Sequence, residues 1–206
     1  MSNVGLLYVG AILFINGLSL MGIVRGKGAT PLNWFVGGLQ IITPTYLIFT
    51  ANGDMDQIFS AGGLYLFGFT YLYVAMNNTW GFDATGLGYY SLFVAVVAVG
   101  YAVVNAVKLG DYAFGVIWLQ WAFLWFLFYL LMGRGMDRLG WFTGGIAALQ
   151  GWITGAVPAF FLLIGVWQEV SVVALAVAEA VVFVIGALLL WAKRPKAVAA
   201  AGEVVR

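Results

Sequence analysis

The sequence predicts an all-α membrane protein, and three observations support the prediction. Hydrophobic residues make up 64% of the 206 residues and charged residues only 8%, whereas about 25% of the residues of a soluble globular domain are charged. Seven apolar segments are each about long enough to cross the hydrocarbon core of a bilayer, which takes about 20 helical residues. The nine basic and eight acidic residues fall almost entirely between these segments or in the tail.

Each segment ends where charged residues, Gly, Pro or Asn interrupt the apolar run. The seven segments are residues 4–24, 33–50, 58–76, 89–107, 112–132, 141–167 and 170–191. Pro44 and Pro158 lie inside two of them, which a membrane helix tolerates when neighbouring helices satisfy the freed backbone groups. The first segment has no basic residues before it and no small-residue cleavage site, so we expect a span rather than a removable signal peptide.

The basic residues predict the orientation, because the cytoplasmic loops of membrane proteins collect Lys and Arg. One set of alternating connections, together with the C-terminal tail, holds Arg25, Lys27, Arg134, Arg138, Lys193, Arg194, Lys196 and Arg206. The other set holds only Lys108. We therefore expect the N-terminus outside and the C-terminus in the cytoplasm.

Glu179 is the one formally charged residue that falls well inside a segment. An ionisable residue at membrane depth is costly and often functional. Glu179 stands between two alanines on the last segment, which also fits a protonated residue that hydrogen-bonds at a helix contact. Both interpretations stay open.

Two segments resemble each other in sequence. Residues 33–40 read NWFVGGLQ and residues 140–147 read GWFTGGIA, and residues 91–95 match the first of these more weakly. Such repeats indicate one structural unit that is used several times, so we predict three similar helix hairpins around an axis. Gly-Gly pairs also permit close helix packing, which is an alternative explanation of the match.

Large side chains share one face on each of three predicted helices. Because of their helical spacing, the sets are Trp118, Trp121 and Trp125 on the fifth segment, Phe69 and Tyr73 on the third, and Leu6, Val9 and Leu13 on the first. A line of three Trp over about 10 Å of helix is too long for one headgroup belt, where membrane Trp usually lies. The stripes therefore indicate either helix packing or the wall of a pore.

The composition excludes several functions. Without His or Cys, the chain lacks the usual ligands of zinc, haem and iron–sulfur clusters, and we expect no cofactor. A net charge of +1 provides no basic surface for a nucleic acid. No Ser/His, Cys/His or paired-carboxylate arrangement is available for catalysis, so we expect no enzyme.

The polar residues within the segments are few and, apart from Glu179, uncharged. A path lined by aromatic rings and sparse amides suits a small neutral solute. Ion conduction uses rings of charges or carbonyl groups, and a proton-coupled carrier needs a relay of titratable groups, of which only Glu179 is present.

Five stretches between residues 4 and 167 match the sequence pattern of a known family, and they occur in the same order as in that family. They read LLYVG at 6–10 with Asn16-Gly17, FVGGL at 35–39, FGFTYLYVAMN at 67–77 followed by YSLFVA at 90–95, IWL at 117–119 with Trp121 and Leu124-Trp125, and Gln150-Gly151 followed by Pro158-Ala159. With this set, the chain resembles the AmiS/UreI family of urea and short-chain amide channels.

The resemblance implies six membrane helices that form three hairpins around a narrow channel. It also implies a hexameric ring of protomers, each with its own pore. Position by position, it implies a cytoplasmic-side aromatic constriction at Trp121, Trp125, Phe69 and Tyr73, with Leu6 nearby. The rest of the passage would be lined by Val9, Leu13, Leu124 and Trp118.

Two features differ from the acid-gated urea channels of that family. This chain has Gln150 where those channels carry a Glu before Gly, and it has none of their loop His, so we expect a pore that is not acid-gated. It also has the extra segment at 170–191. We accordingly expect a six-helix channel domain at residues 1–167, an extra transmembrane helix at 168–192 and a basic cytoplasmic tail at 193–206.

The predicted function is a passive channel for urea or short-chain aliphatic amides across the cytoplasmic membrane. Aromatic walls would contact the flat faces of the solute, while groups such as Tyr73 and Gln150 would replace water at its edge. The expected partners are the neutral solute, membrane lipid and further copies of the chain in a homohexamer. Two alternatives stay open: a proton-coupled secondary carrier that uses Glu179, and a membrane scaffold that recruits a cytoplasmic amidase or urease.

Overall fold

The computed structural model describes residues 2–195, and this part of the chain contains seven helical spans long and apolar enough to cross a membrane. The predicted number of spans is confirmed, and the described residues form no strand. The spans are α1 (Ser2–Leu20), α2 (Thr30–Phe49), α3 (Met55–Trp80), α4 (Thr85–Val103), α5 (Tyr112–Phe128), α6 (Gly140–Gln150) with α7 (Val157–Leu163), and α8 (Val172–Lys193).

Three spans contain a π-helical turn, which hydropathy does not predict. In the sixth span, the π-helical turn η4 (Gly151–Ala156) joins α6 to α7. The π-helical turns η1 (Val104–Lys108) and η2 (Tyr129–Gly133) continue α4 and α5. Short 3₁₀ turns, η3 (Asp137–Leu139) and η5 (Val166–Glu169), flank the sixth span. Such π-helical turns often occur at functional sites.

Polar residues at the segment boundaries begin and end the helices. Asp54 caps α3, because its Oδ1 accepts hydrogen bonds from the backbone N–H groups of Asp56 at 3.0 Å and Gln57 at 3.1 Å. Asp111 caps α5 in the same way. These side chains satisfy backbone donors that the first helical turn leaves free. Gly81 ends α3 at a φ of 74°, a left-handed conformation that favours glycine.

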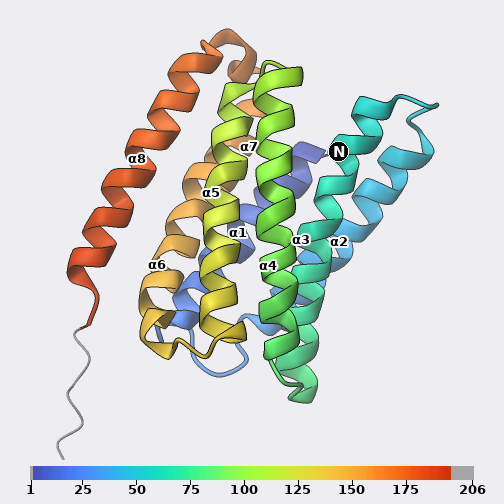
Figure 1. Ribbon diagram of the computed structural model, residues 1–206. Helices are drawn as coiled ribbons and strands as arrows, with labels where there is room; N and C mark the ends of the chain where they lie inside the picture. Colours follow the sequence, from blue (N-terminus) through green and yellow to red (C-terminus); the bar gives the residue numbers. More distant parts are fainter. Residues whose placement is uncertain (1, 196–206) are drawn as a thin grey trace, which may run out of the picture.

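The first six spans follow one another around a ring (Figure 1). Packing is most extensive between α2 and α3, between α4 and α5, and between α6 and α1. The last of these pairs closes the ring, because it joins the first span to the sixth. The ring therefore contains three tightly packed pairs of spans: the second with the third, the fourth with the fifth, and the sixth with the first.

Close backbone contact holds α1 against the sixth span. A Cβ atom on Gly10 would lie 2.5 Å from the Gly151 carbonyl oxygen, and one on Gly17 would lie 2.4 Å from the Gly144 carbonyl oxygen. Small residues let membrane helices approach this closely. The ring therefore closes at a contact in which Gly10 and Gly17 leave no room for a larger side chain at their positions.

Helix α8 lies outside the ring, against α5 and α6 (Figure 1). Of its residues, Ala176 is buried, and most of the others are exposed. Two edge-to-face aromatic pairs, Phe123 with Phe183 and Phe142 with Trp191, join it to the ring. Its removal would not open the ring, because α6 and α1 already close it.

Apart from Glu179, the charged residues that the structure describes gather at the two ends of the bundle. We call the end that carries the N-terminus the N-side and the opposite end the basic side (Figure 1). The basic side holds Arg25, Lys27, Arg134, Arg138, Lys193 and Arg194. Among the described residues, Lys108 is the one basic residue on the N-side, and it forms an ion pair with Asp56. Lys196, Arg206 and most of the predicted tail lie outside the described residues.

Candidate functional site

Two cavities lie among α1, α3, α4 and α5, one toward each end of the bundle. The N-side cavity has a volume of about 510 Å³, and its polar lining is Ser2, Asn3, Gln40, Gln57, Ser60, Tyr101, Asn105 and Asp111. The basic-side cavity has a volume of about 260 Å³, and its polar lining is Asn16, Ser19, Thr70, Tyr71, Asn77, Asn78 and Ser91. Most of the remaining lining of both cavities is apolar.

The two cavities meet at a cluster of aromatic rings. Phe67 and Trp121 line both cavities, so they form the wall between them. The centroids of these two rings lie 4.7 Å apart, and the ring planes are almost perpendicular, at 81°. The Phe67 ring lies 4.8 Å from that of Trp125 and 5.9 Å from that of Trp118. We call these four residues the aromatic junction.

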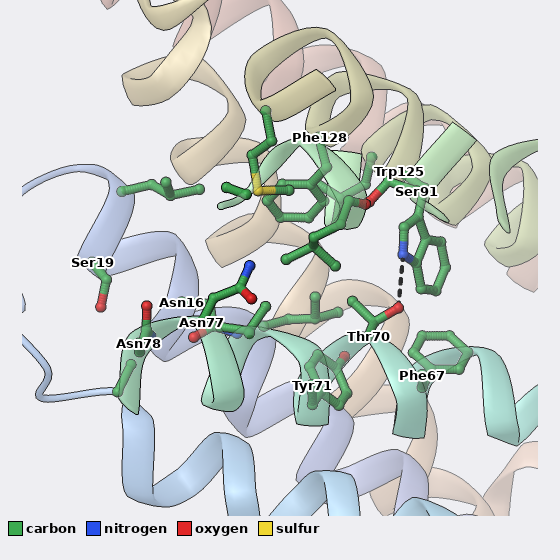
Figure 2. A pocket seen from close by; sticks show the side chains of 18 of the residues that line it. Asn16, Ser19, Phe67, Thr70, Tyr71, Asn77, Asn78, Ser91, Trp125 and Phe128 are labelled. Atoms are coloured by element: carbon green, nitrogen blue, oxygen red, sulfur yellow. Dashed lines mark hydrogen bonds between the residues drawn. The ribbon is translucent and has the colours of Figure 1, made fainter. Parts of the chain in front are cut away.

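Hydrogen bonds fix two of the three indole rings. Trp121 Nε1 donates to Thr154 Oγ1 at 2.8 Å, which links α5 to η4. Trp125 Nε1 donates to Thr70 Oγ1 at 3.3 Å, which links α5 to α3 (Figure 2). A buried indole N–H normally has such a partner. Both rings are therefore held at defined positions by groups on other helices.

Several buried polar atoms in the cavities have no partner in the described protein. In the N-side cavity these are Nε2 and Oε1 of Gln40. In the basic-side cavity they are the Tyr71 hydroxyl, Ser19 Oγ and both amide atoms of Asn77. Because buried polar groups are nearly always hydrogen-bonded, these atoms are suited to bind water or a polar solute.

Seven of the ten predicted site residues line the cavities. Leu6, Val9 and Trp118 line the N-side cavity, Leu13, Leu124 and Trp125 line the basic-side cavity, and Trp121 lines both. All seven are buried. They come from α1 and α5, where the sequence had indicated one stripe each.

The third stripe requires a correction, because Phe69 and Tyr73 line neither cavity. Phe69 is 51% exposed on the outside of α3, and the Tyr73 hydroxyl lies beside Gly86 of α4. The aromatic residues of α3 that line the basic-side cavity are Phe67 and Tyr71. Both pairs have i, i+4 spacing and lie two residues apart, about 200° around the helix, so spacing alone did not distinguish them.

Gln150 lies behind the cavity wall. It is fully buried and lines neither cavity. Its Nε2 donates to the backbone carbonyl oxygen of Gln120 at 2.8 Å, and its own backbone carbonyl oxygen accepts from Thr154 Oγ1 at 2.7 Å. Gln150 therefore supports the residue that holds Trp121.

Glu179 also lies away from both cavities. It is half-buried between α8 and α5, where Gln120 Nε2 donates to its Oε2 at 3.4 Å. This position matches the interpretation of Glu179 as a hydrogen-bonded residue at a helix contact.

The family comparison agrees with this architecture. The model of the AmiS/UreI family transporter matches residues 1–166. The chain belongs to the AmiS/UreI family. It is therefore a multi-pass membrane transport protein, and its relatives are named as transporters and channels rather than enzymes.

Three relatives show the range of this AmiS/UreI group. A protein of Mycolicibacterium smegmatis named as an amidate substrates transporter is 56% identical over 82% of this chain and 79% of its own length. The protein named as transporter AmiS2 of Rhodococcus erythropolis is 48% identical over 90% of each chain. An acid-activated urea channel of Helicobacter pylori is 34% identical over 79% of this chain and 97% of its own.

Solved AmiS/UreI structures share the fold. The electron cryomicroscopy structure of the Helicobacter pylori urea channel in a closed state has a TM-score of 0.73 at 33% identity, and covers 81% of this chain and all of that one. The crystal structure of the urea channel from that organism has a TM-score of 0.71 at 32% identity, with 81% and 99% covered. The relatives are thus named for the transport of amidate substrates or of urea.

Proposed function

We propose that the chain is a passive channel for urea and short-chain aliphatic amides across the cytoplasmic membrane. The observation that carries the proposal is the pair of cavities that open toward opposite ends and meet at the aromatic junction. In this proposal residues 1–167 form the channel domain, 168–192 an additional span and 193–206 a cytoplasmic tail. The N-side faces outward and the basic side faces the cytoplasm, because basic loops stay inside.

The chemistry of the path fits a flat, uncharged solute. Urea and acetamide lose hydrating water when they enter an apolar environment, which is unfavourable unless new hydrogen bonds form. In the cavities, unpartnered groups such as Gln40 and Asn77 replace part of that water. At the aromatic junction, ring faces contact the planar solute. Weak binding at several sites lets the solute leave again.

The same path disfavours ions. Among the residues that line the two cavities, Asp111 is the one with a charge. Its Oδ1 accepts from the Phe114 backbone N–H at 2.9 Å, so it caps α5. The aromatic junction itself offers neither a charge nor a ring of carbonyl groups to replace an ion's hydration.

A hexameric ring, as the family resemblance implies, is part of the proposal. The outside of the bundle carries large exposed apolar side chains, including Phe35, Ile42, Phe69 and Phe93. Such side chains are compatible with lipid and with neighbouring protomers. Each protomer would contain its own pathway, because both cavities lie among α1, α3, α4 and α5 inside the ring of helices that one chain forms.

The decisive experiment measures solute entry into proteoliposomes by stopped-flow light scattering. We expect urea and acetamide to enter faster than in empty vesicles, with a rate that does not saturate and without accumulation against a gradient. Trp121→Ala removes the indole that both cavities share and should abolish most of this entry. Trp152→Ala, which removes a 53% exposed ring outside the cavities, is the matched control and should retain it.

The same vesicles distinguish the two alternatives. A proton-coupled carrier predicts uptake against a gradient and its loss in Glu179→Gln, whereas the channel predicts that Glu179→Gln stays active. A scaffold for an amidase or urease predicts equal entry into protein-containing and empty vesicles. That last result would refute the channel.

A further inference from the structure

Two buried carboxamide groups without partners lie on opposite sides of the aromatic junction. Gln40 lines the N-side cavity, is 0% exposed, and has no partner for Nε2 or Oε1. Asn77 lines the basic-side cavity, and its Nδ2 and Oδ1 are equally unpartnered. Leaving buried donors and acceptors unpaired is costly, so two complete carboxamides without partners indicate a ligand that pairs with them.

The position of Gln40 is shaped by two glycines on neighbouring helices. A Cβ atom on Gly5 of α1 would lie 2.9 Å from Gln40 Oε1, and one on Gly68 of α3 would lie 2.8 Å from the Gln40 backbone oxygen. The absence of these side chains makes room for α2 and for the amide group. Gln40 is thereby held in the same cavity wall as Phe67 and Trp121.

Asn77 lies near the other end of the pathway. It is ten residues after Phe67 on α3, a distance of about 15 Å along a helix. Figure 2 shows Asn77 and Asn16 on one side of the basic-side cavity, with Phe67 and Trp125 on the other. A solute that passes the junction therefore meets one carboxamide before the rings and another after them.

The protein itself contains the pairing that such a group can make. Asn16 Nδ2 donates to Asn33 Oδ1 at 3.0 Å, and Asn33 Nδ2 donates to Asn16 Oδ1 at 2.7 Å. Each carboxamide presents an N–H donor beside a C=O acceptor, so two of them form a reciprocal pair. Urea and primary amides present the same donor and acceptor on one edge.

We propose that Gln40 and Asn77 are two carboxamide sites that recognise the amide edge of the solute by reciprocal hydrogen bonds. This inference rests on the proposed channel function and adds two binding residues and the edge of the solute that they recognise. The preferred solutes are small neutral molecules with N–H and C=O on the same edge, namely urea and primary amides. Glycerol lacks that edge, and N-methylacetamide in its favoured trans form has the two groups on opposite edges.

The test compares Gln40→Leu and Asn77→Leu with the unchanged protein in proteoliposomes. We expect entry of urea and acetamide to fall by about tenfold in each variant, because each loses two hydrogen bonds to the solute. Entry of glycerol and N-methylacetamide should change by less than about twofold. Thr43→Val is the matched control, since Thr43 is 2% exposed on the same helix as Gln40 and lines neither cavity.

A second variant keeps the inference testable if Gln40→Leu fails to fold. Gly5→Ala retains the carboxamide but places a Cβ atom 2.9 Å from its oxygen, and should also reduce the preference for amides over glycerol. If the unchanged protein conducts amides and every variant keeps the same ratio of acetamide to glycerol entry, the carboxamide sites are refuted while the channel stands. If the unchanged protein conducts no solute, the proposed function fails first.

Discussion

Phe67 is the residue at which the two cavities and three indole rings meet. It is 2% exposed and contacts Trp121 and Trp125 with ring centroids less than 5 Å apart. Edge-to-face ring pairs contribute about 0.5–1.5 kcal/mol each beyond the burial of their area. Thr70 and Thr154 hold two of the indoles from other helices. The shape of the aromatic junction thus depends on a few side chains from α3, α5 and η4.

A pair of variants tests which face of α3 lines the pathway. In Phe67→Ala the indoles lose the ring that orients them, and we expect urea and acetamide entry to fall about tenfold, which corresponds to about 1.4 kcal/mol. Phe69→Ala removes the same ring from a 51% exposed position and should leave entry within about twofold. Stopped-flow light scattering on proteoliposomes measures both. An equal loss of solute entry in the two variants would show that Phe67 does not face the pathway more than Phe69 does, and would contradict this orientation of α3.

The sequence identified part of this residue set. Trp118, Trp121 and Trp125 formed a visible stripe because α5 has one such line of indoles. Helix α3 has aromatic residues on opposite faces, and only its packing against α5 shows that Phe67 faces inward. Gln40 was visible as a polar residue at membrane depth, but the sequence did not show that its amide lacks a partner.

At the scale of elements, the ring is closed by the contact between α1 and the sixth span. Gly10 lies against η4 so closely that a Cβ atom would be 2.5 Å from backbone atoms of Gly151 and Ala156. The π-helical turn at η4 is part of this contact, and Thr154, which holds Trp121, lies within it. The turn η4 therefore takes part both in the contact that closes the ring and in holding Trp121 at the aromatic junction.

Two glycine variants test this packing. We expect Gly10→Ala to destabilise the protein by about 1–3 kcal/mol, the usual cost of overpacking, because its new methyl group overlaps backbone atoms that have no free space to move into. Gly38→Ala adds a methyl group where no atom lies within 4 Å and should be neutral or stabilise by up to about 1 kcal/mol. Thermal unfolding in detergent gives both values. A neutral Gly10→Ala would mean that α1 and η4 lie further apart.

Hydropathy predicted the seven spans well, but it did not by itself predict which spans pack against each other. The seven spans follow from long apolar runs, and their ends coincide with caps such as Asp54 and Asp111. The weak repeat predicted three similar units, and the structure shows three tightly packed helix pairs. The π-helical turns were not predicted, because a run of apolar residues is compatible with both an α-helix and a π-helix.

At the scale of the whole molecule, two cavities lie inside the ring, one toward each end. Helix α8 stands outside the ring (Figure 1). The chain has no His, the side chain whose ordinary pKa lies near neutrality. In the loop between α3 and α4, hydrogen bonds from the Thr85 side chain and backbone lower the pKa of Asp83 from its ordinary value. Asp83 therefore stays ionised throughout mildly acidic conditions.

This charge distribution predicts a pore without an acid gate. A carboxyl group with a lowered pKa, such as that of Asp83, stabilises the fold above its unfolded pKa and loses that contribution only as the pH falls through its folded pKa. We expect entry of urea into proteoliposomes to change by less than about twofold between pH 7.5 and pH 5. The control is the acid-activated urea channel of Helicobacter pylori in identical vesicles. A large rise at pH 5 in this chain would contradict the prediction.

The sequence by itself determined the class of protein and the number of spans, because hydropathy and charge placement are local properties of the chain. The tertiary structure decided which face of α3 points inward, how α1 meets η4, and that Gln40 and Asn77 remain without partners. Lipid and protein interior are both apolar, so burial gives a membrane helix no periodic signal of which side faces the pathway. Only the packing of one helix against another supplies that information.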